Sequence, residues 1–150
     1  MREILFRAKR KNWRKLTKEE WWVEGVSIEI KDKMYMAVEY VDSERITDFE
    51  MAQYILQKSF AEIDPETLCQ FTGLTGKNGK QIWENDIVKH EISDTIGTVK
   101  WCEEDYVGWC VDDVMIDEQQ FTGEMWSECV VIGNAFDDKH FLVETDYCAE

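Results

Sequence analysis

The residues from Asp64 to Lys89 constrain the fold of this chain more than any other stretch. They read DPETLCQFTGLTGKNGKQIWENDIVK. A proline after an aspartate favours an extended residue followed by a turn. Asn78 and Gly79 readily adopt positive φ, and the residues 84–86 form a second turn signal. Apolar residues alternate with polar ones between these turns, so the stretch predicts short antiparallel strands and leaves no room for a long helix.

The N-terminal part predicts an opening strand over residues 1–7 and a hairpin. The hairpin consists of strands at 21–30 and 34–41, joined by a turn at 31–33. Alternation in its first strand predicts that one set of side chains faces the core: Trp22, Val26, Ile28 and Ile30.

A single helix is expected to follow this hairpin. Thr47 or Asp48 caps it, and it ends at about residue 58. Its apolar face, which includes Phe49 and Ala52, predicts a core or oligomer contact.

The second half continues with short strands at 87–91, 96–101, 106–111 and 127–133, and Gly97 is interpreted as a bulge or bend. We therefore predict a mainly β fold (α+β with one short helix) made of short antiparallel strands and hairpins. The region 1–62 is expected to hold the hairpin and helix. The region 63–150 is expected to form a small SH3-like barrel, with both regions packed as one compact unit.

Charge divides the chain into a basic start and an acidic remainder. Residues 1–18 hold eight bases and one acid, a net charge of +7, whereas the other residues hold nine bases and 31 acids, a net charge of −22. An acidic surface repels phosphate, so nucleic acid is expected only at residues 7–18. That basic segment has a second interpretation, in which it pairs with acids of its own or a neighbouring chain.

Cysteine usage and hydropathy indicate a cytoplasmic protein. The five cysteines are an odd number without a C-x-x-C pair, and they are expected to be reduced thiols. The apolar residues 4–6 are too few for a secretory signal, and no window approaches the roughly 18 apolar residues of a membrane span, so no membrane partner is expected.

These residues together resemble the YopX family of phage and prophage proteins. The resemblance rests on MREILFRAKR at the start, Trp22 to Gly25, the Asp64–Val88 stretch, Ile96 to Val99, and Val131 to Asn134. It implies a small phage-encoded protein of uncharacterised function and supplies no catalytic or ligand residue. Asn85 stands where the family usually has Gly, and asparagine tolerates positive φ, so the turn is expected to survive.

No pattern for catalysis, a cofactor or a metal emerges, so we predict a protein that is not an enzyme and has no cofactor. A pairing of Cys69 with His90 as a nucleophile is weighed against inert packing, which is the commoner role of apolar cysteines. The glycine-rich loop 76–79 is weighed as an anion cradle against a plain turn. The acidic clusters lack calcium-loop periodicity.

The seven tryptophans are the strongest functional hint, since tryptophan is enriched in protein interfaces. We predict a non-enzymatic protein–protein interaction module that binds a host or phage protein and assembles as a homo-oligomer. The alternatives are an acidic nucleic-acid mimic that inhibits a host DNA-binding protein, and a nucleic-acid binder through the basic arm. The predicted interaction residues are Trp21, Trp22, Trp83, Trp101, Trp109, Arg7, Arg10, Lys11 and Arg14.

Overall fold

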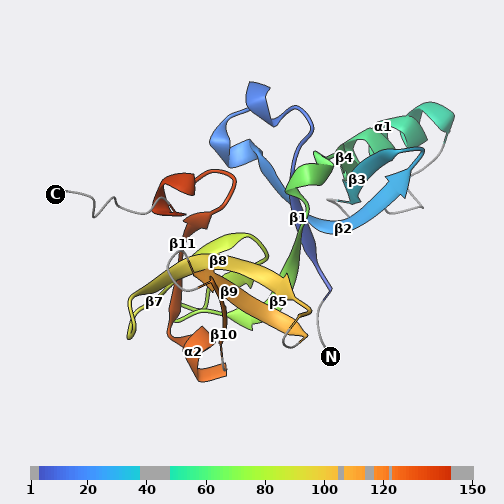
Figure 1. Ribbon diagram of the computed structural model, residues 1–150. Helices are drawn as coiled ribbons and strands as arrows, with labels where there is room; N and C mark the ends of the chain where they lie inside the picture. The colour runs from blue at the N-terminus through green and yellow to red at the C-terminus, as the bar shows by residue number, and fades with distance from the viewer. Residues whose placement is uncertain (1–3, 38–47, 105–106, 114–116, 122, 143–150) are drawn as a thin grey trace. The chain divides into compact units, whose positions relative to one another are not determined.

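The computed structural model describes residues 4–37, 48–104, 107–113, 117–121 and 123–142 (Figure 1). The chain divides into two compact units, Glu3–Gln70 and Phe71–Glu150, which we call the N-terminal and C-terminal units and describe separately. The division falls inside a strand, β5 (Cys69–Thr75). The first residues of β5 pair with the N-terminal unit and the rest pair with the C-terminal unit.

The N-terminal unit is an antiparallel sheet with the strand order β4-β3-β2-β1-β5. Its own strands are β1 (Phe6–Lys9), β2 (Trp22–Ile30), β3 (Lys33–Ala37) and β4 (Phe60–Glu62). The sheet curls, because a bridge between Arg10 and Ile63 brings the chain after β4 against the chain after β1. Short 3-10 helices lie between these elements: η1 (Trp13–Lys15), η2 (Lys18–Glu20) and η4 (Pro65–Thr67).

Local chemistry explains the hairpin and the helix of this unit. Lys31 and Asp32 both have positive φ, at 49° and 66°, as a two-residue hairpin turn between β2 and β3 requires. The helix α1 (Phe49–Ser59) begins after Asp48, whose Oδ1 accepts the Met51 backbone N–H at 2.7 Å. The predicted Asp48 cap is therefore confirmed. The predicted strand residues 38–41 lie outside the described residues.

The core of the N-terminal unit uses the face of β2 opposite to the one predicted. Val23 is buried together with Ala8 of β1 and Met36 of β3, while Val26 and Ile30 are 57% and 54% exposed. Both faces of β2 carry apolar residues, so alternation alone does not define the inner face. The decision comes from the neighbouring strands, whose small and flexible core residues lie on the Val23 side.

The C-terminal unit contains a five-stranded antiparallel sheet with the order β10-β9-β8-β7-β11, and β5 and β6 form a further hairpin. The elements are β6 (Gln81–Trp83), β7 (Asp86–His90), β8 (Thr95–Cys102), β9 (Gly108–Asp113), β10 (Asp117–Gln120), α2 (Gly123–Ser127), β11 (Cys129–Asn134) and η5 (Lys139–Leu142).

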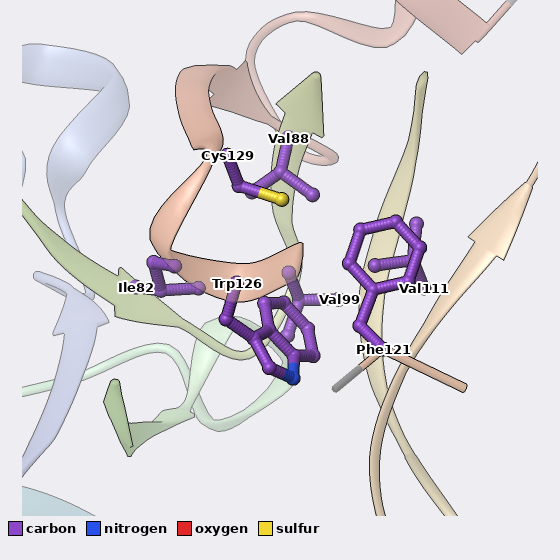
Figure 2. Close-up of a cluster of buried hydrophobic side chains, with 7 residues drawn as sticks. All are labelled: Ile82, Val88, Val99, Val111, Phe121, Trp126 and Cys129. Atoms are coloured by element: carbon purple, nitrogen blue, oxygen red, sulfur yellow. The ribbon is translucent and has the colours of Figure 1, made fainter. Parts of the chain in front are cut away.

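One apolar cluster holds this unit together (Figure 2). Trp126 of α2 and Phe121 lie 5.2 Å apart between ring centroids and cover the aliphatic side chains of the sheet. The cluster consists of Ile82, Val88, Val99, Val111, Phe121, Trp126 and Cys129. The turn before β7 supports it, since Asn85 takes φ 66° as expected and the buried Asp86 accepts the Trp83 backbone N–H at 2.8 Å.

The prediction of a mainly β fold is confirmed, while three finer expectations change. A second short helix, α2, follows β10, and neither element was predicted. Gly97 sits in regular register opposite Val88 rather than in a bulge. Within the described residues the sheet ends at β10 and β11, and no pairing closes it, so the SH3-like barrel stays a prediction.

Candidate functional site

The tryptophans occupy three kinds of environment. Trp83 and Trp126 are 3% and 4% exposed, so the structure places the predicted interaction residue Trp83 in the interior of the folded unit. Trp13, Trp21, Trp22 and Trp109 are half-buried. Trp101 is exposed, at 42%. A high tryptophan count therefore does not by itself leave many rings on the surface.

A cation–tryptophan cluster organises the basic start of the chain, and it consists of Arg7, Lys9, Arg14, Lys18, Trp13, Trp21 and Trp22. Lys9 is only 2% exposed, and its Nζ lies 3.8 Å and 4.5 Å from the ring centroids of Trp13 and Trp21. Trp13 and Trp21 meet edge to face at 4.9 Å. A cation is attracted to the negative face of an indole, so Lys9 holds this segment onto β1.

The arginines of this segment that were predicted as interaction residues also make contacts within the N-terminal unit. Arg7 lies 5.0 Å from the Trp22 ring, and Arg14 lies 4.4 Å from the Trp13 ring. The Arg10 Nε donates to the Glu20 carbonyl at 3.1 Å. Lys11 is exposed. Residues 7–18 are therefore folded against their own tryptophans rather than extended as an arm.

A hollow beside this cluster carries mixed charge. Its walls are formed by Arg10, Asn12, Leu16, Glu19, Glu20 and Trp22. The two glutamates offset the arginine, so the hollow has no strong preference for an anion or a cation.

The glycine-rich loop 76–79 uses its own N–H groups internally. Gly76 donates to the Lys80 carbonyl at 2.9 Å, Lys77 donates to the Cys129 carbonyl at 2.8 Å, and Gly79 donates to the Gly76 carbonyl at 3.0 Å. An anion cradle needs such N–H groups directed at the ligand. The arrangement fits a turn that docks on β11.

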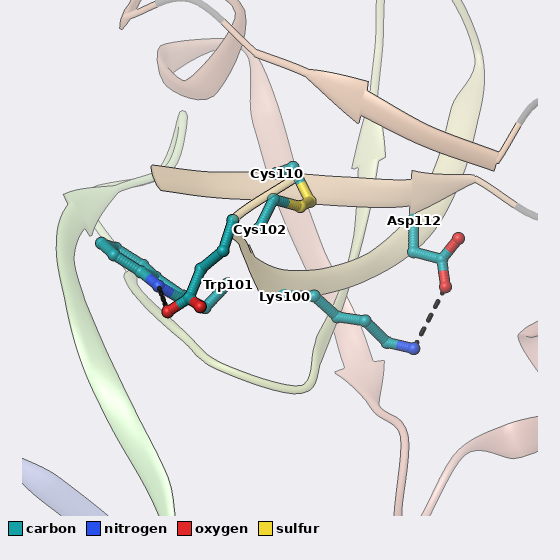
Figure 3. Close-up of a disulfide and its surroundings, with 6 residues drawn as sticks. Lys100, Trp101, Cys102, Cys110 and Asp112 are labelled. Carbon is teal, nitrogen blue, oxygen red and sulfur yellow. Dashed lines mark hydrogen bonds and ion pairs between the residues drawn. A yellow bond between two sulfur atoms is a disulfide. The ribbon is translucent and has the colours of Figure 1, made fainter. Parts of the chain in front are cut away.

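Two cysteines that were expected to be reduced form a disulfide. Cys102 of β8 and Cys110 of β9 are bonded, with their Cα atoms 6.3 Å apart (Figure 3). The register pairs Cys102 with Gly108, and Cys110 with Lys100, so the two cysteines are diagonal neighbours on one face of the hairpin. This separation suits a disulfide. The pairing depends on the register, and cysteine spacing alone does not reveal it.

The remaining described thiols are buried and held in hydrogen bonds. The Cys69 Sγ donates to the Thr67 carbonyl at 3.2 Å, and the Cys129 Sγ donates to the Met125 carbonyl at 3.3 Å. Burial raises the pKa of Cys129 to about 12 from its ordinary value of 9.0, and the nearby Glu128 carboxylate adds to this increase. A thiolate is the reactive form of cysteine, so Cys129 stays unreactive at neutral pH.

His90 supports a turn. It is 6% exposed, and its Nδ1 lies 2.7 Å from the Ser93 Oγ and accepts the Ser93 backbone N–H at 3.3 Å. The Ser93 Oγ is in turn 2.8 Å from the Thr95 Oγ1. These contacts link the two ends of the β7–β8 connection. Within the described residues, no group of three or more His, Cys, Asp or Glu side chains is placed to hold a metal ion.

Trp101 and Trp109 form the exposed end of the C-terminal core. They are directly opposite in the β8–β9 register, next to the Val99–Val111 pair on the same face, and their ring centroids are 5.1 Å apart, edge to face. The Trp101 Nε1 donates to the Glu103 Oε1 at 3.0 Å. The Trp109 Nε1 is buried, and no described residue accepts from it. We call this pair of rings the Trp101–Trp109 surface.

The fold and these sites define a mainly β protein of two antiparallel units. None of the described helices is long and apolar enough to span a membrane. The chain belongs to the YopX family, because the family model described as YopX protein matches residues 5–142. No curated protein matches the chain.

Proposed function

We propose that this chain is a non-enzymatic protein–protein interaction module of phage or prophage origin, and that its contact surface is the Trp101–Trp109 surface. The observation that carries this proposal is the 42% exposure of Trp101 at the end of a buried core face. Tryptophan is prominent among the residues that dominate binding energy at interfaces. An exposed indole in this position offers a partner a large apolar contact.

The geometry around Trp101 favours binding because the ring is already oriented. Trp109 supports one side of it, and the hydrogen bond to Glu103 fixes the indole edge. A side chain that is ordered before binding loses less conformational entropy when a partner docks.

The states of the described candidate nucleophiles support a role without catalysis. Cys129 has a raised pKa, and the Cys69 thiol donates to a backbone carbonyl in a buried position. His90 is occupied by the turn at Ser93. A nucleophile must be both activated and accessible. The described free cysteines, Cys69 and Cys129, are buried.

Affinity capture from the bacterial host, with quantitative mass spectrometry, tests the proposed surface. The bait proteins are wild type, Trp101→Ala and Ile92→Ala. Ile92 is 76% exposed in the same unit, so it controls for a general loss of surface hydrophobicity. A partner retained by wild type and Ile92→Ala and lost by Trp101→Ala supports the proposal. Equal retention of every partner by Trp101→Ala overturns it.

The alternative of an acidic nucleic-acid mimic also has one supporting observation. The β9–β10 register pairs Asp113 with Asp117 and Asp112 with Glu118. Acidic residues paired along two strands would suit a basic partner, although Lys100 already offsets Asp112. Competition between this protein and DNA for a host DNA-binding protein would favour this alternative, whereas capture that depends on Trp101 favours the first.

The alternative of a nucleic-acid binder now depends on few residues. Lys9 is buried and Arg7 lies half-buried on the Trp22 ring, whereas Lys11, Arg14, Lys15 and Lys18 are exposed. Phosphate binding requires accessible cations and weakens steeply with salt. Binding to DNA or RNA at low salt that is lost in the double variant Lys11→Ala, Lys15→Ala would support this function.

We further propose self-association and a location in the bacterial cytoplasm. Val26, Ile30 and Phe49 of the N-terminal unit are more than half exposed and provide apolar area for a second copy. Light scattering on a sizing column tests the assembly, and a monomer at micromolar concentration would contradict it. Alkylation of thiols at the moment of cell lysis tests the compartment, because a cytoplasm tends to keep thiols reduced. Alkylation of Cys102 and Cys110 supports the cytoplasm, whereas a Cys102–Cys110 bond already formed in the cell contradicts it.

A further inference from the structure

The tryptophans of the N-terminal unit carry cations on their rings, and those of the Trp101–Trp109 surface do not. Trp13 has Lys9 and Arg14 within 4.4 Å of its ring centroid, and Trp22 has Arg7 at 5.0 Å. Among the described residues, no base lies over Trp101 or Trp109. The indole of Trp101 is 42% exposed and is the same kind of ring that attracts cations elsewhere in this chain.

The surroundings of Trp101 strengthen the attraction for a cation. Glu103 accepts the indole N–H through one oxygen, and Glu104 next to it is exposed. Lys100, the base nearest in sequence, alternates to the opposite face of the strand, where its Nζ lies 3.1 Å from the Asp112 Oδ2 (Figure 3). Residues 71–150 hold 18 acids and five bases, a net charge of −13. The local and the overall charge both favour a positive ligand.

We infer that the Trp101–Trp109 surface binds an arginine-bearing segment of another protein, an inference that rests on the proposed function. A guanidinium is planar, so it stacks on an indole while its N–H groups donate to a carboxylate such as Glu103. A lysine ammonium is not planar, so it cannot stack on the indole and donate to the carboxylate at the same time as a guanidinium does.

We take the partner to be a different protein, because the described arginines of this chain are already engaged. Arg7 and Arg14 lie on tryptophans, and Arg10 donates to the Glu20 carbonyl. Releasing any of them would break a contact within the N-terminal unit. An arginine from outside costs no such rearrangement.

Peptide titration followed by NMR tests the inference directly. The probes are short acetylated glycine–serine peptides that contain one leucine and one arginine, with versions that carry lysine or citrulline instead of arginine. We expect the indole N–H signals of Trp101 and Trp109 to shift with the arginine peptide. The lysine peptide should bind about threefold more weakly and the citrulline peptide at least about tenfold more weakly, because citrulline is uncharged. Raising the salt concentration should weaken binding.

Two variants make the test specific. Trp101→Leu should abolish binding, and Glu103→Gln should weaken it about threefold while leaving the exposed position intact. Glu124→Gln, at an exposed carboxylate of α2, serves as the matched control and should bind like wild type. If Trp101→Leu does not fold, the comparison of Glu103→Gln with Glu124→Gln decides.

The outcomes separate this inference from the proposed function. Equal binding of arginine and citrulline peptides, no binding of any peptide, or shifts confined to Trp13, Trp21 and Trp22 would overturn the arginine inference. Loss of a captured host protein in Trp101→Ala but not in Glu103→Gln would preserve the interaction module and remove only the cationic partner. Capture that is independent of Trp101 would remove the proposed function itself.

Discussion

The buried lysine of the cation–tryptophan cluster gives the sharpest stability prediction. Lys9 Nζ lies 3.8 Å from the Trp13 ring centroid, and the side chain is 2% exposed. A cation–π contact contributes about 0.5–1 kcal/mol at an exposed site and about 2 kcal/mol when it is desolvated. Because this contact is shielded from water, we expect a coupling energy of about 1–2 kcal/mol between Lys9 and Trp13.

A double-mutant cycle isolates this energy. The single change Lys9→Met also removes the cost of burying an ammonium, so its own effect on stability mixes two opposing contributions. The cycle of Lys9→Met with Trp13→Leu cancels such contributions and leaves the pairwise interaction. Urea unfolding is followed through backbone amide NMR signals of residues 4–37, which report the N-terminal unit alone.

The control cycle pairs Trp13→Leu with Lys15→Met. Lys15 is exposed and lies in the same 3-10 helix as Trp13. Its coupling should be below about 0.5 kcal/mol. A Lys9–Trp13 coupling as small as that of the control would refute the conclusion that the indole holds the ammonium. So would a favourable coupling that vanishes in moderate salt, because the contact is buried.

Three further predictions concern the C-terminal unit. A Cβ at Gly97 would collide with a backbone carbonyl of β9, so Gly97→Ala should lower the free energy of unfolding by about 2 kcal/mol, as measured by thermal unfolding. The control is Gly123→Ala, whose Cβ meets no atom within 4 Å and whose free energy of unfolding should stay within about 0.5 kcal/mol of wild type. The pKa of Cys129 is raised to about 12 from 9.0, so its contribution to stability should be complete below pH 9 and fall by about 1.4 kcal/mol per pH unit above it. Urea unfolding at several pH values measures this, and a free energy of unfolding that falls with pH no more steeply in wild type than in Cys129→Ala would contradict it. The Cys102–Cys110 bond spans a separation of 8 residues, so its reduction should lower the free energy of unfolding by about 2.5 kcal/mol. In a thiol titration of the denatured protein without reductant, three of the five cysteines should react.

Local chemistry made the central stretch predictable from the sequence. Asp64 caps η4, accepting the Glu66 backbone N–H at 3.2 Å, and both Gly79 and Asn85 adopt the positive φ that their turns require. The Asp48 cap was found for the same reason. Each of these features depends on residues a few positions apart, so the sequence contains the whole interaction.

Features that depend on pairing between distant strands were not predictable in this way. The inner face of β2 is decided by Ala8 and Met36 on its neighbours, and the Cys102–Cys110 bond is decided by the β8–β9 register. β10 and α2 are too short for their periodicity to stand out.

The candidate site was predictable only in part. Trp101 and Trp109 were named from the abundance of tryptophan, but their opposition in one register and the role of Glu103 were not visible in the sequence. Lys9 was counted only as one of the eight bases of residues 1–18, whereas its backbone bonds to Thr67 and Asp64 fix it in the interior. Burial of a lysine depends on such long-range contacts.

The position of β5 limits how this gene can be shortened or recombined. The residues Cys69 and Gln70 pair with β1, whereas Phe71 and Leu74 pair with β6. A truncation between residues 70 and 71 therefore divides β5, and each fragment keeps only part of its pairing. A fragment that ends at residue 70 and one that begins at residue 71 would each carry an interrupted edge strand. Shuffling whole units between relatives should therefore succeed only when the donor sequence includes all of β5, which makes this strand the smallest piece that both units must inherit together.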